Sequence, residues 1–268
     1  MVPGMRWGVM ATLDDTHVVR SLEVEFIEVL MREGDPLERL KRLLETEDRD
    51  LIVHAPERML LDGRSWIIDL ADEDPGRREA FVDRIDEIAR LTHQYKVATV
   101  VHPGGVRKHL VADRALLARN LGESLGAIEG QLWIENMPRR YHCGNDLLWC
   151  NLLLHPEEFD DILPYVDGVT LDVCHAYLSV EKGGNAAIAS FFERLKGRIR
   201  HVHLSDASYP NNEGLQLGRG NIDMAALPRL RRLPVLLEVW GGHHNDLAGY
   251  REALAKVREE RWFRGCVP

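Results

Sequence analysis

The chain has 268 residues, of which 45% are hydrophobic and 29% charged, so it can form a packed core and is too apolar for a disordered chain. Its 43 acidic against 34 basic residues give a formal charge of −9 and no general attraction to nucleic acid or to an anionic membrane. The four cysteines lack CxxC spacing, which argues against a disulfide framework and favours a cytoplasmic setting. Neither a signal-peptide pattern nor a membrane-spanning apolar run occurs in the sequence.

Short apolar runs alternate with charged amphipathic stretches, a rhythm typical of parallel strands joined by helices. The predicted strands are Arg6–Ala11, Val24–Leu30, Leu51–His54, Ala98–His102, Leu132–Glu135, Gly168–Val173, Ile199–Leu204 and Val235–Val239. The predicted helical connections are Asp14–Leu22, Asp35–Glu45, Arg77–His93, Asp113–Ile128, Pro156–Leu163, Asn185–Leu195, Met224–Leu230 and Asp246–Arg258.

Eight such βα units in about 250 residues match the size of a closed barrel, so the sequence predicts an α/β fold with residues 1–268 as a single (β/α)8 TIM-barrel domain. An open doubly wound sheet is the competing topology. Its best-known nucleotide-binding form is disfavoured, because no GxGxxG loop follows the first predicted strand.

Six of the predicted strands end in a side chain that can bind a metal ion. These residues are His54, His102, Glu135, Asp172, His203 and Glu238, and Glu28 has a similar place on the second strand. Because side chains alternate along a strand, one parity faces the helices and these residues face the barrel axis at the C-terminal rim, where barrel enzymes place their active sites. Carboxylates buried together are costly without a cation. Mixed with imidazoles they form a ligand set suited to zinc or manganese, and we expect one or two such ions per chain.

The same residues belong to short motifs that occur in a familiar order. These are HAP at 54–56, VHPG at 101–104, IEN at 134–136, LDVCHA at 171–176, HLSD at 203–206 and LGRGNID at 217–223. They resemble the xylose isomerase-like TIM-barrel superfamily, which contains sugar-phosphate isomerases and epimerases together with the endonuclease IV repair nucleases. The likeness covers about residues 24 to 240.

This resemblance implies roles for individual residues. The central divalent metal would be held by Glu135, Asp172, His203 and Glu238. A second metal, where present, would use His54 and His102, with Glu135 bridging the two ions. His175 resembles either a substrate-binding histidine of the epimerase branch or a third-zinc ligand of the nuclease branch.

Two departures from the nuclease pattern favour sugar chemistry. Where the nucleases carry an Asp-x-His element before the LGxGN motif, this chain has Asn212-Glu213-Gly214, so the third-metal site is predicted to be absent or remade. The residue after HAP, often a tyrosine that opens DNA in the nucleases, is Glu57, and an acid there would repel phosphate.

The sequence therefore favours a metal-dependent sugar or sugar-phosphate isomerase or epimerase with a small carbohydrate substrate. Glu135 and Glu238 are expected to move a proton through a metal-stabilised enediolate, while His175 orients a substrate hydroxyl. Arg139 and Arg140 would clasp a substrate phosphate, or else form an exposed charged loop. The alternative is a hydrolase of the endonuclease IV type, in which a metal-bridged hydroxide cleaves a phosphodiester.

Overall fold

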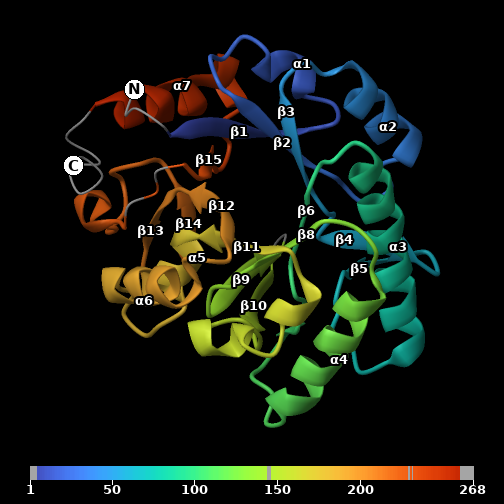
Figure 1. The fold of residues 1–268 in the computed structure, drawn as a ribbon. Helices are drawn as coiled ribbons and strands as arrows, with labels where there is room; N and C mark the ends of the chain where they lie inside the picture. The colour runs from blue at the N-terminus through green and yellow to red at the C-terminus, as the bar shows by residue number, and fades with distance from the viewer. Residues whose placement is uncertain (1–4, 144–145, 229, 231, 260–268) are drawn as a thin grey trace.

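The computed structural model describes residues 5–143, 146–228, 230 and 232–259, and its centre is a closed barrel of parallel strands surrounded by helices (Figure 1). In spatial order the barrel strands are β1 (Arg6–Thr12), β15 (Pro234–Leu237), β12 (Ile199–Leu204), β11 (Gly168–Asp172), β8 (Leu132–Glu135), β6 (Thr99–Val101), β3 (Asp50–His54) and β2 (Phe26–Leu30). The predicted barrel is confirmed, and each predicted strand matches one of these to within two residues at either end.

Most of the outer helices also lie where they were predicted. They are α1 (Thr16–Val19), α2 (Leu37–Thr46), α3 (Pro75–Gln94), α4 (Arg114–Ala127), α6 (Asn185–Leu195) and α7 (His244–Arg258). The helices predicted over 156–163 and 224–230 are wrong in kind, because only the short 3-10 turns η1 (Pro156–Phe159), η2 (Leu163–Tyr165) and η3 (Met224–Ala226) form there. Pro164 and Pro228 lack the backbone N–H that a continuing helix needs. Arg229, within the second range, lies outside the described residues.

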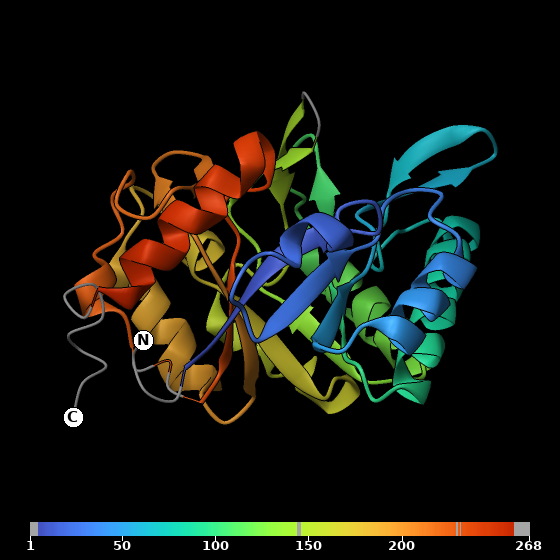
Figure 2. The same cartoon turned by 90° about the horizontal axis from the view of Figure 1, so that it is seen from above.

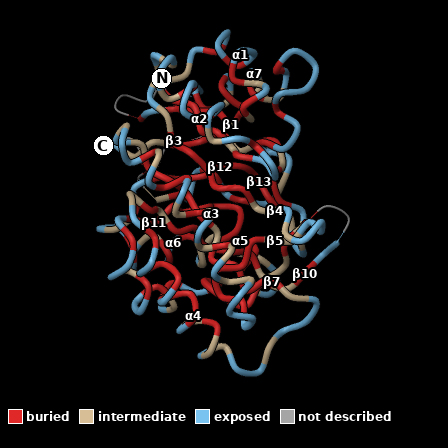
Figure 3. Tube along the Cα trace, turned by 90° about the vertical axis from the view of Figure 1, so that its right-hand side faces the viewer, coloured by how far each residue is buried: buried red, intermediate tan, exposed pale blue. Residues whose placement is uncertain are grey.

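The barrel interior is apolar at one end and polar at the other. Phe26, Ile52, Val100 and Leu236 form an apolar layer of their own inside the strands, separate from the larger core between strands and helices. In Figure 3 the buried trace runs through the middle of the molecule and the exposed trace lies around it. The polar strand-end residues therefore lie above a dry apolar layer.

Loops at the C-terminal ends of the strands carry small β elements that the sequence did not predict. These are β4 (Arg58–Leu61) with β5 (Arg64–Ile67), β7 (Val106–Arg107) with β10 (Asp146–Cys150) and β9 (Arg140–Cys143), and β13 (Asp206–Ser208) with β14 (Asn212–Leu215). A short helix, α5 (Val173–Leu178), follows β11 directly. Figure 2 shows the β4–β5 hairpin projecting from one end of the barrel. These insertions form the walls around the rim.

Two aspartates of the sequence motifs, Asp206 and Asp223, hold rim loops in place rather than act as ligands. The buried carboxylate of Asp206 accepts backbone N–H groups of Gly218, Gly220 and Ile222 at 2.8 to 3.1 Å, so the LGRGNID loop is folded around a single side chain. Asp223 caps η3 by accepting the N–H of Ala225. The motif is thus explained by loop geometry.

A substitution at Gly104 in the HPGG loop is predicted to have a large effect on stability. Gly104 has φ +80°, and a Cβ there would lie 2.2 Å from Asp69 Oδ1 and 2.6 Å from the Asp69 Cα. We expect Gly104→Ala to lower the free energy of unfolding by about 3 kcal/mol, measured by urea denaturation. Gly34→Ala is the matched control, because Gly34 has φ +78° and no atom within 4 Å of the added Cβ, so only the backbone strain of about 1 kcal/mol applies. Equal losses in the two variants would contradict the packing argument.

The cysteines and helices carry no further motif. Cys143, Cys150 and Cys174 are buried free thiols, and Cys266 lies outside the described residues. Over the described ranges, none of the helices has the length and apolarity needed to cross a bilayer.

Candidate metal centre and substrate pocket

Three of the strand-end carboxylates converge around His203 at the C-terminal end of the barrel. His203 Nδ1 lies 3.0 Å from Glu238 Oε2, 3.4 Å from Glu135 Oε2 and 3.9 Å from Asp172 Oδ2. His203, Glu135 and Asp172 are buried, whereas the Glu238 side chain is 21% exposed. The sequence-predicted central set is therefore brought together, with Glu238 on its accessible side.

Two further imidazoles approach Glu135 from the neighbouring strands. His54 Nε2 lies 3.6 Å and His102 Nε2 lies 3.5 Å from Glu135 Oε2. His54 Nδ1 donates to the carbonyl of Ala55 at 2.7 Å, so Nε2 is the nitrogen that faces the carboxylate and would be available to a cation once its proton is displaced. Glu135 thus lies between two possible cation positions.

The donor atoms of this cluster fit a divalent cation. Glu135 Oε2 and His203 Nδ1 are buried and have no hydrogen-bond partner, which is costly unless something binds them. Two ligands bonded about 2.1 Å from one tetrahedral ion lie about 3.4 Å apart, close to the separations seen here. Groups that could hold an ion include Glu135 with Asp172 and His203, and Glu135 with His54 and His102.

The carboxyl groups of this cluster have strongly shifted pKa values in the metal-free protein. Burial raises the pKa of Asp172 well above its usual value, and the neighbouring carboxylates of Glu238 and Glu135 raise it further. Burial acts in the same direction on Glu135, but the imidazoles of His203 and His102 outweigh it and hold the pKa of Glu135 well below its ordinary range. A divalent cation would allow all three carboxyl groups to ionise together.

Asn136 positions two residues of the cluster, a role that the sequence analysis missed. Its side chain donates to the Asp172 carbonyl at 3.0 Å and accepts the Asp172 N–H at 2.8 Å, so it joins β8 to β11 where both strands end. The carbonyl of Asn136 lies 2.9 Å from His175 Nδ1. The IEN motif contained the signal, because an amide that follows a strand-end acid can pair with the adjacent backbone.

His175 lies beside Glu135 and has a second acidic neighbour, Glu213, to which the sequence analysis assigned no role. Its Nδ1 lies 3.0 Å from Glu135 Oε1, and its Nε2 lies 3.5 Å from Oε2 of Glu213. Burial raises the pKa of Glu213 to about 7. Glu213 comes from the segment that replaces the nucleases' Asp-x-His element, so that departure in sequence marked a changed site. Tyr141 also contacts the His102 and His175 rings, and no sequence signal indicated it.

A pocket of about 300 Å³ opens beside Glu238 and His54. It is lined by Met10, Ala11, Thr12, Asp15, Leu30, His54, Glu57, Tyr141, His142, Glu238, Val239, Trp240, Gly241, His243 and Tyr250. Among these described residues there are three acids, several aromatic rings and no lysine or arginine. The pocket therefore favours an uncharged ligand with apolar C–H faces over a phosphate.

Arg139 and Arg140 are not brought to this pocket. The guanidinium of Arg140 lies 3.7 Å from the centre of the Trp149 ring, its cross-strand partner in the β9–β10 pair, and Arg139 forms an ion pair with Glu181 at 3.2 Å. Cross-strand stacking on β10 orients Arg140, and pairing with a neighbouring loop orients Arg139. Neither arrangement directs a guanidinium to the metal cluster.

We therefore expect Arg140→Ala to leave metal affinity and the KM for a sugar substrate within about twofold of wild type. Loss of the cation–π contact should lower the free energy of unfolding by about 0.5 to 1 kcal/mol. Metal titration, steady-state kinetics and urea denaturation test the three quantities. A tenfold rise in KM confined to phosphorylated sugars would instead support phosphate binding by this residue.

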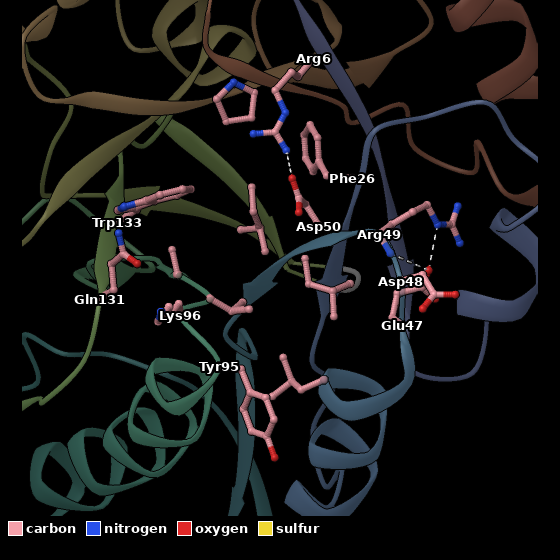
Figure 4. A pocket seen from close by; sticks show the side chains of 16 residues that line it. Arg6, Phe26, Glu47, Asp48, Arg49, Asp50, Tyr95, Lys96, Gln131 and Trp133 are labelled. Carbon is pink, nitrogen blue, oxygen red and sulfur yellow. Dashed lines mark hydrogen bonds and ion pairs between the residues drawn. The ribbon is translucent and has the colours of Figure 1, made fainter.

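A cavity of about 540 Å³ lies at the opposite end of the barrel (Figure 4). Its prominent charges pair with each other, as in the ion pairs of Arg6 with Asp50 and Arg49 with Glu47. Trp133 and Phe26 close it toward the barrel interior. Residues at the N-terminal ends of barrel strands usually serve stability, and these paired charges fit that use.

Comparisons with known proteins agree with the fold. A family model described as xylose isomerase-like TIM barrel matches residues 17–260. A solved D-tagatose 3-epimerase-like protein superposes with a TM-score of 0.72 at 21% identity, covering 96% of this chain and 98% of that one. The 3-keto-D-glucoside 4-epimerase from E. coli superposes with a TM-score of 0.68 at 15% identity over 95% and 99% of the two chains. A probable endonuclease 4 of Mycoplasma pneumoniae is 24% identical over 238 residues, covering 80% of this chain and 75% of that protein.

Proposed function

This chain belongs to the xylose isomerase-like TIM barrel family, and from that premise we propose that it is a metal-dependent isomerase or epimerase of a small, uncharged sugar. The observation that carries the proposal is the convergence of Glu135, His203 and Glu238 beside an acidic, aromatic pocket that lacks lysine and arginine among its described lining residues. Several epimerases of sugars share the fold, and that likeness agrees with the proposal.

The cation of this proposal, zinc or manganese, would be held by Glu135, Asp172, His203 and Glu238. When bound, it would polarise a substrate carbonyl and the neighbouring hydroxyl. Asn136 keeps Asp172 at the end of β11, and Asp172 in turn accepts the backbone N–H of His175 at 2.5 Å. The chain therefore orients its donors before substrate arrives.

Proton transfer is assigned to Glu135 and Glu238, which come from strands three places apart in the barrel order. Both carboxylates lie within 3.4 Å of the same imidazole nitrogen of His203, so they flank a common point. Glu238 lines the pocket, and its partial exposure suits a base that removes a substrate proton. Glu135 would deliver a proton taken up from solvent to the opposite face of the substrate, Glu238 would release the proton that it removed to water, and His175 would hold a substrate hydroxyl.

The experiment follows hydrogen exchange in deuterated water. Purified protein loaded with Zn²⁺ or Mn²⁺ is incubated with unphosphorylated ketoses, and deuterium incorporation at the carbon next to the carbonyl is followed by NMR. We expect incorporation and conversion with free sugars, and none with Glu238→Gln. Failure of every ketose tested, with metal bound at about one or two ions per chain, would overturn the isomerase proposal.

A metal-dependent hydrolase of the endonuclease IV type is the second candidate, and the positions of His54 and His102 favour it. Both imidazoles face the carboxylate of Glu135 at 3.5 to 3.6 Å, an arrangement suited to a second cation that shares this carboxylate. The similarity to a probable endonuclease 4 points the same way. Cleavage of a duplex with an abasic site, without deuterium exchange into sugars, would favour this candidate.

A further inference from the structure

Beneath the metal cluster, Glu28 forms a buried hydrogen-bonded unit with two histidines, and the proposed chemistry does not use it. Glu28 Oε2 lies 2.6 Å from His201 Nε2, and Glu28 Oε1 lies 3.1 Å from His203 Nε2. All three side chains are fully buried. His201 Nδ1 is held by the carbonyl of Pro234 at 3.0 Å, so the unit is anchored to β15.

These contacts determine which nitrogen of His203 is available for a metal. An ionised carboxylate only accepts hydrogen bonds, so His203 Nε2 must carry a proton and donate it to Glu28. The neutral imidazole then has its lone pair on Nδ1, the atom that faces Glu135, Asp172 and Glu238.

The surroundings make a purely packing role for Glu28 costly. The next layer of the barrel interior is apolar, and the Phe26 ring contacts His201 edge to face at 5.6 Å. A carboxylate buried here costs several kcal/mol that its hydrogen bonds must offset. The separations of 2.6 to 3.2 Å are ordinary hydrogen bonds between donor and acceptor, so this group needs no ion of its own.

We propose that Glu28 is a positioning residue of the metal centre, which holds His203 with Nε2 protonated and Nδ1 ready to bind the cation, while His201 keeps Glu28 in place. The inference rests on the proposed metal centre. Outer carboxylates of this kind orient a ligating imidazole and increase its basicity, and their loss commonly costs 10- to 100-fold in metal affinity.

Metal affinity of two Glu28 variants provides the first test. Glu28→Leu removes the acceptor and should weaken Zn²⁺ binding about 10- to 100-fold in a competition titration with a chelating dye. Glu28→Gln keeps an acceptor oxygen for His203 but loses the charge, so its affinity should lie between those of wild type and Glu28→Leu. Asp206→Asn is the matched control, because it neutralises another fully buried carboxylate that binds only backbone N–H groups. Wild-type affinity in all folded Glu28 variants would overturn the proposal.

The second test needs only wild-type protein, so it holds even where a variant does not fold. Histidine ring ¹⁵N NMR of the metal-free protein should find the His203 proton on Nε2, and ¹¹³Cd-loaded protein should show coupling from the metal to Nδ1. A metal-free His203 without a proton on Nε2, or coupling from the metal to Nε2, would refute the inference. If no metal binds at all, the proposed function fails, whereas the proton position in the metal-free protein still decides the role of Glu28.

Discussion

Replacing Glu135 with glutamine is expected to weaken divalent-metal binding at least 100-fold and to slow deuterium exchange into the substrate at least about 1,000-fold. The carboxylate lies within 3.0 to 3.6 Å of four imidazoles, more than any other acid of the cluster contacts. Glutamine keeps the shape but removes the charge that a cation requires, and it cannot accept the substrate proton. The two readouts are isothermal titration with Zn²⁺ and the NMR exchange assay.

The matched control for this prediction is Glu57→Gln. Glu57 lines the pocket beside His54 and Glu238 but belongs to none of the groups that could hold an ion among the described residues. Its replacement should leave metal affinity within about twofold of wild type. If the two variants bound metal equally well, Glu135 would have no place in the centre.

The second large effect is a reversal of pH dependence when metal is added. Burial lowers the pKa of His54, but the nearby carboxylate of Glu135 outweighs it and raises this pKa to about 9, above the ordinary 6.5. The folded metal-free protein therefore holds this proton more tightly than the unfolded chain does. The stabilisation is complete below pH 6.5 and is lost as pH rises through 9. The raised pKa values of Asp172 and Glu213 act in the same direction, since both acids hold protons in the folded state.

A cation competes with these protons, so its affinity should rise with pH. We expect the metal-free Tm to fall between pH 6.5 and pH 9, while the increase in Tm caused by buffered Zn²⁺ grows over the same interval. A free concentration of 100 times Kd would add about 2.7 kcal/mol to the free energy of unfolding. Differential scanning calorimetry with chelator or with metal measures both trends. His54→Gln should flatten the metal-free trend, and a metal-induced gain that shrank with pH would contradict the assignment of these groups.

The barrel itself could be predicted because its signals are local. Each strand is a short β-branched run and each long helix has a charged face, so eight repeats of the pattern limited the topology to very few choices. The helical assignments over 156–163 and 224–230 were wrong because proline overrode the charge pattern. The rim hairpins were missed although one of them has a local signal, since β4 and β5 are joined by the two-residue turn Asp62-Gly63, which is typical of a hairpin in sequence.

The cluster of acids and histidines at the rim could be predicted for the same reason as the barrel. A ligand-type residue at the end of an inward-facing strand position must lie at the rim, and closure of the barrel brings six such residues together whatever the loops do. Asn136 acts through Asp172, and Glu28 acts through His201 and His203. These contacts join distant parts of the chain, so a single sequence does not indicate them. The position of Arg139 and Arg140 in the sequence suggested phosphate binding. In the structure, Arg140 instead stacks on Trp149 and Arg139 pairs with Glu181.

The sequence by itself determined the parallel barrel, the rim where the candidate site lies and the residue types gathered there. Strand periodicity and strand ends can be read from short stretches of sequence, which is the reason. Only the tertiary structure decided what those residues face. Contacts between distant segments, such as the hydrogen bond of Glu28 with His203 and the ion-pair contact of Glu213 with His175, depend on closure of the barrel and on loop packing. The role of the acidic residues also depends on the fold. Some of them form part of the buried cluster, and others line a pocket whose described lining residues include no lysine or arginine.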